Sequence, residues 1–487
     1  MRRFIAAAAA SLVILVAVLV GRAWHMPSRQ VTVPPAPPAA VDADAAAQRL
    51  AGALRLATVS TQDAAHFDGA PFRALHAYLA ERFPLVHQTL QREVVNDYSL
   101  LYTWEGTGAG PPAVLLAHLD VVPVDPSTEA SWIHPPFGGV IADGYVWGRG
   151  AIDDKGSALA ILESVEHLLA AGYQPPRTVL LAFGHDEEVS GEHGARAMAE
   201  MLRTRGVTPA FVLDEGGAIL EGLFPGVAAP VASIGMAEKG YVTVELTVEG
   251  TGGHSSMPPP HTAVGQLSAA IERLESHPMP SNLDAAMGRS LEYIGPEMGL
   301  PLRLAAANLW LFKPVVEWQL GRAPQTNAVI RTTTAPTMFQ GGVKENQLPT
   351  SARAAVNFRI LPGDTVEGVV EHVRHVVEDP QVKIAVLGHS NEPSPVSDID
   401  GPVFAYLART VRATNPDTVV APFLVLGGTD ARHYAGMTPN VFRFVPMRTR
   451  PDDVPRFHGL NERLSVVDYA AMIQFYIELL RGLNGLS

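Results

Sequence analysis

Apolar runs and helix-spaced apolar positions alternate along the first half of the chain. The run at 113–117 (AVLLA) is apolar at every position, as expected of a strand buried on both faces. The same kind of pattern predicts further strands at 100–104, 145–147, 178–183 and 210–213, and helices at 43–54, 70–83, 157–171 and 191–205. This alternation predicts an α/β domain with helices on both faces of a central, mostly parallel sheet.

The pattern changes after about residue 237. The segment 240–249 (GYVTVELTVE) alternates apolar and polar positions, which is typical of a half-exposed strand. A helix at 263–275, strands at 327–338 and 353–360, a helix at 365–378 and a strand at 381–387 complete the order βαββαβ, which predicts an inserted ferredoxin-like domain. Helices at 402–413 and 465–483 and a strand at 440–444 are assigned to the first domain again.

The N-terminus carries its own signal. Arg2 and Arg3 precede an uncharged, mostly apolar run from Phe4 to Gly21, which is near the lower length limit for a helix that spans a bilayer. No convincing A-x-A cleavage site follows the run. We therefore expect an uncleaved signal anchor, with the arginines inside and the body of the protein on the periplasmic or secreted side. A cleaved signal peptide on an exported protein is the alternative.

These patterns predict a layout of five segments. An N-terminal signal anchor or signal peptide (1–25) is followed by a Pro/Ala-rich linker (26–42) that acts as a semi-rigid spacer. The main domain then has a first part (43–237) and a second part (390–487), with the inserted lid domain (238–389) between them. The inserted domain itself contains an additional stretch at about 277–322, rich in Leu, Met and Pro.

Composition narrows the classes of function. The chain has 487 residues, of which 47% are hydrophobic and 17% charged, as in a globular protein with a sizeable core. The net charge of -13 and the lack of a long basic run argue against nucleic acid as a partner. The chain has no cysteine, which excludes disulfides, thiolate metal ligands and a cysteine nucleophile. A metal site must therefore be built from His, Asp and Glu.

Acids and histidines collect where the predicted strands end. His118 and Asp120 follow the buried run at 113–117 and face the same way, while 185–188 (HDEE) and Asp214 follow two other apolar runs. Asp153 and Asp154 lie in a glycine-rich turn between a strand and a helix. Each segment alone also fits a solvated turn or a histidine with a local hydrogen bond. Ligands bind at the carboxyl ends of strands in open α/β sheets, so the four segments together predict one cleft.

Seven motifs in order carry a family resemblance: HLDVVPV (118–124), GRGAIDDKG (148–156), HDEE (185–188), LDEGG (213–217), GGHSSMP (252–258), GGTDAR (427–432) and FHGLNE (457–462). Together they resemble the dinuclear-zinc aminoacylase/carboxypeptidase superfamily. The stretch NAVIRTTTAPTMFQGGVKENQLP (327–349) is most similar to the carboxypeptidase S branch, which also holds secreted N-fatty-acyl-amino-acid hydrolases. The resemblance covers the chain from about residue 45 onward.

The resemblance implies a metal centre with two zinc ions per subunit, for which Co²⁺ or Mn²⁺ are expected substitutes. His118 and Asp214 would bind one ion, and Glu188 and His458 would bind the other. Asp153 would bridge both ions, since a shared carboxylate offsets the repulsion between two close divalent cations. The resemblance also implies a cis peptide bond after Asp153.

The resemblance implies catalytic roles as well. Asp120 would hydrogen-bond His118, and Glu187 would act as the general base that moves a proton from water to the leaving nitrogen. His254 would reach the oxyanion of the tetrahedral intermediate, and in dimeric relatives this histidine comes from the partner's small domain. Arg432 would hold the free carboxylate of the substrate, with Arg359 and Asn327 as further candidates for the same end.

We therefore expect a zinc hydrolase that cuts an amide next to a free α-carboxylate in small peptides or N-acyl amino acids. A homodimer through the lid domain and a membrane contact through the N-terminal segment are further expectations. One alternative is an amidase for lipidated amino acids, because the apolar stretch 300–320 could line an acyl-chain pocket, lie against the membrane or simply cap the small domain. Another is a catalytically silent binding protein, which the loss of Glu187 or of ligands would mark; none is lost.

Overall fold

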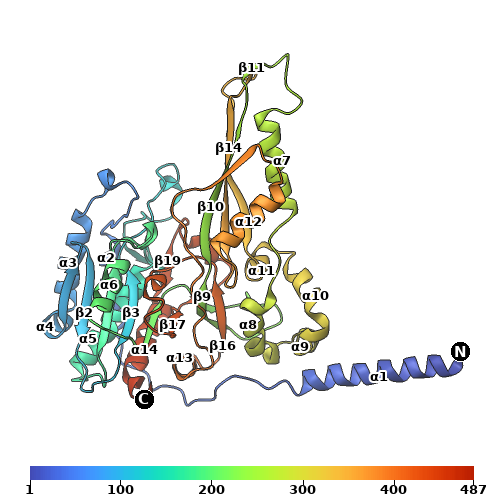
Figure 1. The fold of residues 1–487 in the computed structure, drawn as a ribbon. Helices are drawn as coiled ribbons and strands as arrows, with labels where there is room; N and C mark the ends of the chain where they lie inside the picture. The colour runs from blue at the N-terminus through green and yellow to red at the C-terminus, as the bar shows by residue number, and fades with distance from the viewer. Residues whose placement is uncertain (487) are drawn as a thin grey trace.

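A ten-stranded mixed sheet forms the centre of the protein in a computed structural model, which describes residues 1–486 (Figure 1). The strand order is β1-β2-β6-β3-β7-β17-β9-β8-β18, and β16 pairs with β9. The pairs β6–β3, β3–β7 and β7–β17 are parallel, whereas β1–β2 and β2–β6 at one edge are antiparallel. The strands are β1 (Gln91–Val95), β2 (Ser99–Trp104), β3 (Ala113–His118), β6 (Val179–Gly184), β7 (Phe211–Asp214), β8 (Ile219–Leu220), β9 (Val231–Glu238), β16 (Val419–Val425), β17 (Val441–Arg443) and β18 (Arg448–Thr449).

Strand β3 lies between two apolar layers, as its unbroken apolar run predicts. Leu115 and Ala117 belong to one core cluster, together with residues of α2, α5 and α14. Val114 and Leu116 belong to a second cluster on the other side, with residues of α6. The helices of this domain are α2 (Ala43–Leu54), α3 (Ala70–Arg82), α4 (Pro84–Thr89), α5 (Lys155–Ala170), α6 (Ala195–Thr204), α13 (Pro402–Thr414) and α14 (Val466–Arg481). The predicted α/β class with helices on both faces of the sheet is confirmed.

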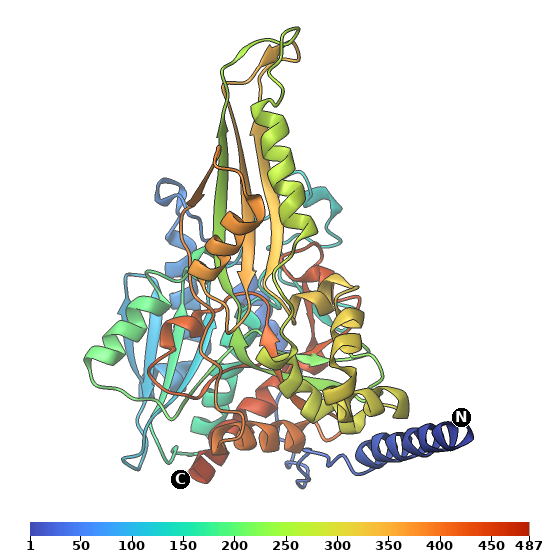
Figure 2. The same cartoon turned by 45° about the vertical axis from the view of Figure 1, so that its right-hand side comes forward.

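A second, four-stranded antiparallel sheet rises from the body, and Figure 2 shows its long strands and two helices standing clear of the larger sheet. Its order is β12-β14-β10-β15, and α7 and α12 pack on it through a separate apolar cluster. The elements are β10 (Gly240–Glu249), α7 (Ala263–Ser276), β12 (Thr333–Gly341), β14 (Ser351–Ile360), α12 (Val366–Val377) and β15 (Val382–Val386). Two short strands, β11 (Gly253–His254) and β13 (Gln347–Leu348), pair at the far tip (Figure 1).

Several elements differ from the expected pattern. The strand expected at 327–338 starts later, because α11 (Pro324–Ala328) comes first with a proline in its first turn, a position that favours helix. Strand β9 was not predicted, since Ala232, Ser233 and Gly235 interrupt its apolar pattern although every residue of it is buried. Strand β16, which pairs with β9 in parallel, was not predicted either. A small three-stranded sheet of β4 (Val140–Ala142), β5 (Tyr145–Trp147) and β19 (Arg463–Ser465) lies apart from both main sheets.

The N-terminal run forms a single helix, α1 (Arg2–Trp24), and its most apolar stretch of 18 residues has a mean hydropathy of 2.8. By length and composition it could cross a membrane, a test that a signal sequence also passes. The linker after it lies on the body instead of acting as a detached spacer. The side-chain amide of Gln30 donates through Nε2 to the carbonyl of Val420 and accepts the amide of Val420 at Oε1, and the amide of Ala36 donates to the carbonyl of Ala413.

The additional stretch inside the lid segment is helical. It forms α8 (Met287–Ile294), α9 (Leu300–Ala307) and α10 (Leu309–Leu320) before α11. Helix α8 packs on the main domain, where the hydroxyl of Ser290 donates to the carbonyl of Pro422 on β16. Helices α9 and α10 lie at the end of the body from which α1 projects (Figures 1 and 2).

Candidate active site

Asp153 lies between two histidines that come from opposite ends of the chain. Its Oδ1 is 2.8 Å from Nε2 of His118, and its Oδ2 is 3.0 Å from Nε2 of His458. The expected cis peptide bond between Asp153 and Asp154 is confirmed. The turn that carries them needs Gly150, whose φ of +87° is in the left-handed region that favours glycine. One carboxylate thus lies between two imidazoles, a position from which it could serve two metal ions.

Asp120 connects the first histidine to the acidic turn after β6. Its carboxylate lies 3.3 Å from Nδ1 of His118 and accepts the hydroxyl of Ser60 at 2.7 Å. The backbone amides of Glu187 and Glu188 also donate to it, at 3.2 and 3.1 Å. Asp120 is completely buried, so these contacts replace water around its charge. One carboxylate therefore fixes both the ring of His118 and the start of the HDEE segment.

Glu188 completes a cluster that could hold a cation. Its Oε2 lies 3.2 Å from Nε2 of His458. One ligand atom each from His118, Asp153 and Glu188 lies within 4.8 Å of the other two. The second oxygen of Glu188, Oε1, is buried and has no hydrogen-bond partner within residues 1–486. A buried carboxylate oxygen without a donor is costly unless a cation meets it, so the donor set fits a metal ion.

The surrounding acids show how much negative charge the site concentrates. Burial raises the pKa of Glu187 and of Glu215 well above the usual range, and neighbouring carboxylates add to the effect. Burial also raises the pKa of Asp214, to about 6. For His458, hydrogen bonds to Asp153 and Glu188 raise the pKa to about 10. Carboxylates packed this closely attract cations, and divalent ions are the natural counter-charge.

A buried ion pair holds the Asp153 turn and the His458 loop together, and the sequence did not single it out. Oε1 of Glu462 accepts the amides of Ile152 and Asp153, at 2.8 and 3.2 Å. Oε2 of Glu462 accepts Nη1 of Arg149 at 2.7 Å, and Nη2 of Arg149 donates to the carbonyl of His458. The FHGLNE motif contains Glu462, but only the fold shows that this side chain reaches back to residues 149–153.

A buried lysine also supports the turn that carries Asp153. Lys155 is completely buried, and its Nζ donates to the carbonyls of Ala53 and Leu56 at the end of α2. Burial lowers its pKa to about 7. Lys155 thus ties the first helical residue of α5 to α2, which accounts for the lysine in GRGAIDDKG without a role in chemistry.

A cavity of about 680 Å³ opens over the cluster and is lined by Glu187, Glu188 and His458. Basic residues line the same cavity: Arg359 from β14, Arg432 from the 427–432 turn, and the buried Lys239. Arg359 lies over the ring of Tyr241 at 4.9 Å. The acids of the candidate metal site and two guanidinium groups therefore share one cavity between the body and the lid.

The turn that carries Arg432 is fixed by another buried pair. Glu238 accepts the amide and the hydroxyl of Thr429 at 3.0 and 2.8 Å, and Arg443 lies 3.4 Å from the same oxygen. At Gly428 a Cβ would lie 2.6 Å from Nη1 of Arg432, so only glycine lets the guanidinium lie this close to the backbone. These contacts position Arg432 at the cavity wall.

Three expected site residues lie elsewhere or are engaged differently. Asp214 is buried at the end of β7, where its oxygens accept the amides of Glu215 and Ala431. His254 is exposed on β11 at the tip of the lid and bonds Ser256, away from the cavity of its own chain (Figure 1). Asn327 lies on α11 and is not among the described residues that line the cavity. The remaining expected residues are brought together.

Removal of Glu462 tests how the centre is held. In Glu462→Ala the amides of Ile152 and Asp153 lose their acceptor, and we expect metal affinity to fall about 10- to 100-fold. Competition with a chromophoric chelator measures this. Glu93→Ala, which removes a surface ion pair with Arg205, is the control and should bind metal as the unaltered protein does. Equal affinities of the two variants would contradict the positioning role.

Comparisons with known proteins agree with the fold and the site. The profile of peptidase family M20/M25/M40 matches residues 114–482. The probable carboxypeptidase S-like 2 of Dictyostelium discoideum is 42% identical over 441 residues, 90% of this chain and 84% of that protein. The N-fatty-acyl-amino acid synthase/hydrolase of Xenopus tropicalis is 42% identical over 440 residues, 89% of this chain and 85% of that protein.

A solved structure shows the same fold. The M20 family metallo-carboxypeptidase Sso-CP2 from Sulfolobus solfataricus matches with a TM-score of 0.66 over 90% of this chain and 98% of that chain, at 18% identity. The resemblance drawn from the seven motifs is confirmed, as is the expectation of a metal-dependent hydrolase of the carboxypeptidase type. The chain belongs to peptidase family M20/M25/M40.

Proposed function

We propose that the protein uses two metal ions to hydrolyse an amide bond next to a free α-carboxylate. The observation that carries this proposal is the shared cavity, which is lined by Glu187, Glu188 and His458 and also by Arg359 and Arg432. A carboxylate held by guanidinium groups would place the neighbouring amide over the acids. Small peptides and N-acyl amino acids have this arrangement.

His118 and Asp214 would hold one ion, Glu188 and His458 the other, and Asp153 would lie between them. Histidine and carboxylate ligands without thiolates suit zinc, with Co²⁺ or Mn²⁺ as substitutes. When bound, such ions lower the pKa of water and polarise a carbonyl oxygen. For Asp214 to serve, its carboxylate would have to turn from the amides of Glu215 and Ala431, which it accepts here.

Glu187 would act as the general base. Its backbone is fixed by Asp120, and its side chain reaches the cavity wall. Burial raises its pKa well above that of a free glutamate, which brings the group closer to the pH at which a base must both accept and return a proton. Glu187 would take the proton of the attacking water and give it to the leaving nitrogen.

Arg432 would bind the substrate carboxylate, with Arg359 beside it. Burial lowers the pKa of Arg359, and the charge of Arg432 lowers it further. Two guanidinium groups that repel each other in this way gain from an anion placed between them. Asn327, which does not line the cavity, would contribute only indirectly.

His254 would act from a second subunit. It is exposed at the tip of the lid and is not among the described residues that line the cavity of its own chain. A homodimer through the lids would bring this histidine to the partner's cavity, where it could stabilise an oxyanion. The exposed tip, with Met257 79% and Val343 93% exposed, supports such an interface.

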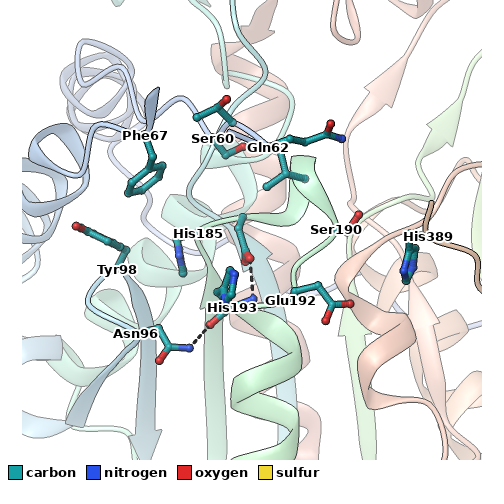
Figure 3. Close-up of a pocket in the computed structure, with 13 residues that line it drawn as sticks. Ser60, Gln62, Phe67, Asn96, Tyr98, His185, Ser190, Glu192, His193 and His389 are labelled. Carbon is teal, nitrogen blue, oxygen red and sulfur yellow. Dashed lines mark hydrogen bonds between the residues drawn. The ribbon is translucent and has the colours of Figure 1, made fainter. Parts of the chain in front are cut away.

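A second substrate class has its own support. Next to the main cavity lies a pocket of about 560 Å³, which shares Gln62, Ser190 and His389 with it (Figure 3). Phe67 and Tyr98 form an aromatic wall there. Together with the relative named as an N-fatty-acyl-amino acid synthase/hydrolase, this pocket favours lipidated amino acids as an alternative substrate.

The N-terminal helix would hold the enzyme in a membrane. Arg2 and Arg3 are the first two residues of α1 and would remain on the inner side, which would place the catalytic body outside, in the periplasm or on the secreted side. Cleavage of this segment and export of the body is the alternative.

A substrate screen tests the proposed function. The zinc-loaded protein is expected to hydrolyse Gly-Leu-type dipeptides and to leave the matching dipeptide amides intact, because the amides lack the carboxylate for Arg432. In Arg432→Met we expect kcat/KM for the free acid to fall by about 100-fold, in line with the loss of a bidentate ion pair. N-oleoyl amino acids form the second arm: faster hydrolysis of these would favour the lipid alternative. No turnover of either class would overturn the proposal.

Removal of the base tests the mechanism. In Glu187→Gln we expect kcat to fall by about 10²- to 10⁴-fold, while metal content stays the same. Glu200→Gln, which alters an exposed acid on α6 that pairs with Arg196, is the matched control and should keep full activity. Unchanged hydrolysis by Glu187→Gln at full metal occupancy would rule out this residue as the base.

Removal of the shared carboxylate tests the bridge. Asp153 contacts both histidines, so Asp153→Ala is expected to release both ions together. Elemental analysis after dialysis against trace chelator gives the stoichiometry. Retention of one ion at unchanged affinity would show that the two sites do not share Asp153.

A further inference from the structure

Helices α9 and α10 are apolar, yet no residue of either helix is buried. Large apolar side chains are exposed along both: Leu300 55%, Leu302 44%, Trp310 59%, Leu311 40%, Val315 59% and Trp318 63%. An apolar surface of this kind usually marks an interaction site. We call these six residues the α9–α10 face.

Helix α10 has two distinct sides. Leu309, Val316 and Leu320 share one side, by helical spacing, and pack against the core. Leu311, Val315 and Trp318 follow at spacings of four and three and occupy the opposite side. The outward side is therefore as apolar as the inward one. Such a helix needs an apolar environment on both sides.

The contacts of α1 set the depth of this face relative to a bilayer. The 18 residues from Phe4 to Gly21 extend about 27 Å, slightly less than a hydrocarbon core of about 30 Å. An anchor this short has no spare length, so its last turn must stay at the hydrocarbon boundary. Leu19 and Ala23 in this turn are buried in the protein.

The partner of this last turn is the α9–α10 junction. Nδ2 of Asn308, between the two helices, donates to the carbonyl of Leu19 at 3.0 Å, and Nε of Arg22 donates to the carbonyl of Ala307. If Leu19 lies at the hydrocarbon boundary, residues 307–308 lie there too. Figures 1 and 2 show both helices beside the near end of α1, on the side of the body toward which α1 extends.

The segment after α1 holds this arrangement. The side chain of Met26 packs on Gly295, where a Cβ would lie 2.9 Å from its Cε. Arg29 pairs with Glu292 at 2.8 Å, and Gln30 bonds the backbone of Val420. These three contacts, with Gly295 just after α8, with α8 itself and with β16, restrict movement of the anchor relative to the body.

We infer that the α9–α10 face binds the surface of the bilayer, with Trp310 and Trp318 at the level of the headgroups. Tryptophan favours this boundary because its ring is apolar and its N–H is polar. Arg322, stacked over Trp318 at 5.0 Å, places a cation next to lipid phosphates. The inference rests on the proposed anchor and goes beyond it: the body has a second, folded membrane contact that fixes its orientation.

The lack of cysteine in the chain makes a direct test practical. Val315→Cys and Trp318→Cys, each in the full chain, are labelled with an environment-sensitive fluorophore and reconstituted into phosphatidylcholine/phosphatidylglycerol vesicles. Val94→Cys, exposed on β1 at the edge of the main sheet, is the control in water. Val13→Cys, in the middle of α1, is the control in the hydrocarbon. Lipids with a quencher near the headgroup or deep in the acyl chain report the depth.

We expect headgroup quenching at positions 315 and 318 to exceed that at position 94 by at least about threefold. Deep quenching should be strongest at position 13. Labels at 315 and 318 that are quenched no more than the label at 94 overturn the inference, and a deeply quenched label at 13 shows that the anchor itself still stands. Blue-shifted emission at 315 without lipid quenching indicates a second protein copy on the face and also overturns it. Hydrolysis measured on the same vesicles separates these outcomes from failure of the proposed catalytic function.

Discussion

The carboxylate of Asp153 is the contact on which the rest of the centre depends. It touches His118 at the end of β3 and His458 in the loop before β19, so residues more than 300 positions apart meet on one side chain. The acids around it, Glu187, Glu188 and Asp214, gather negative charge that folding alone would not tolerate. Cations held by these acids, as proposed above, would offset this cost.

Hydrogen bonds between buried acids and backbone groups fix the positions of the side chains in this centre. Asp120 orients His118 and holds the amides of the HDEE turn, while Glu462 holds the amides before Asp153 and, through Arg149, the carbonyl of His458. Asp120 and Glu462 each accept hydrogen bonds from several donors. Residues that hydrogen-bond metal ligands in this way hold those ligands in the orientation that a metal ion needs. The metal-binding side chains therefore have little freedom to rearrange.

The sequence predicted the elements best where burial was complete. The run at 113–118 matches β3 residue for residue, because a strand covered on both faces needs an apolar side chain at every position. Strand β9 is equally buried, but it contains the small residues Ala232, Ser233 and Gly235. Its sequence therefore lacks the unbroken run of large apolar residues that marks β3. Helix α11 (Pro324–Ala328) covers the first two positions of the strand expected at 327–338. A proline in the first turn of a helix favours the helix, and here this preference outweighs the strand pattern of the residues that follow.

The sequence indicated most residues of the candidate site, but it indicated only part of how they contact one another. Strand ends and one glycine-rich turn pointed to His118, Asp120, Asp153, Glu187, Glu188 and Asp214, and the family motifs added His458. The role of Glu462 depends on a contact across 309 positions that periodicity cannot show. The engagement of Asp214 by two backbone amides and the distance of Asn327 from the cavity likewise follow from tertiary packing.

The two arginines of the cavity connect catalysis to the arrangement of the domains. Arg359 belongs to β14 of the lid and Arg432 to a turn of the body, and the charge of Arg432 lowers the pKa of Arg359. Without an anion, their repulsion favours separation of lid and body. In the proposed substrate complex, a carboxylate between the two guanidinium groups would offset this repulsion and would favour an arrangement in which lid and body lie close together. The free carboxylate would then do more than orient the amide: it would favour the closed form in which that amide is cut.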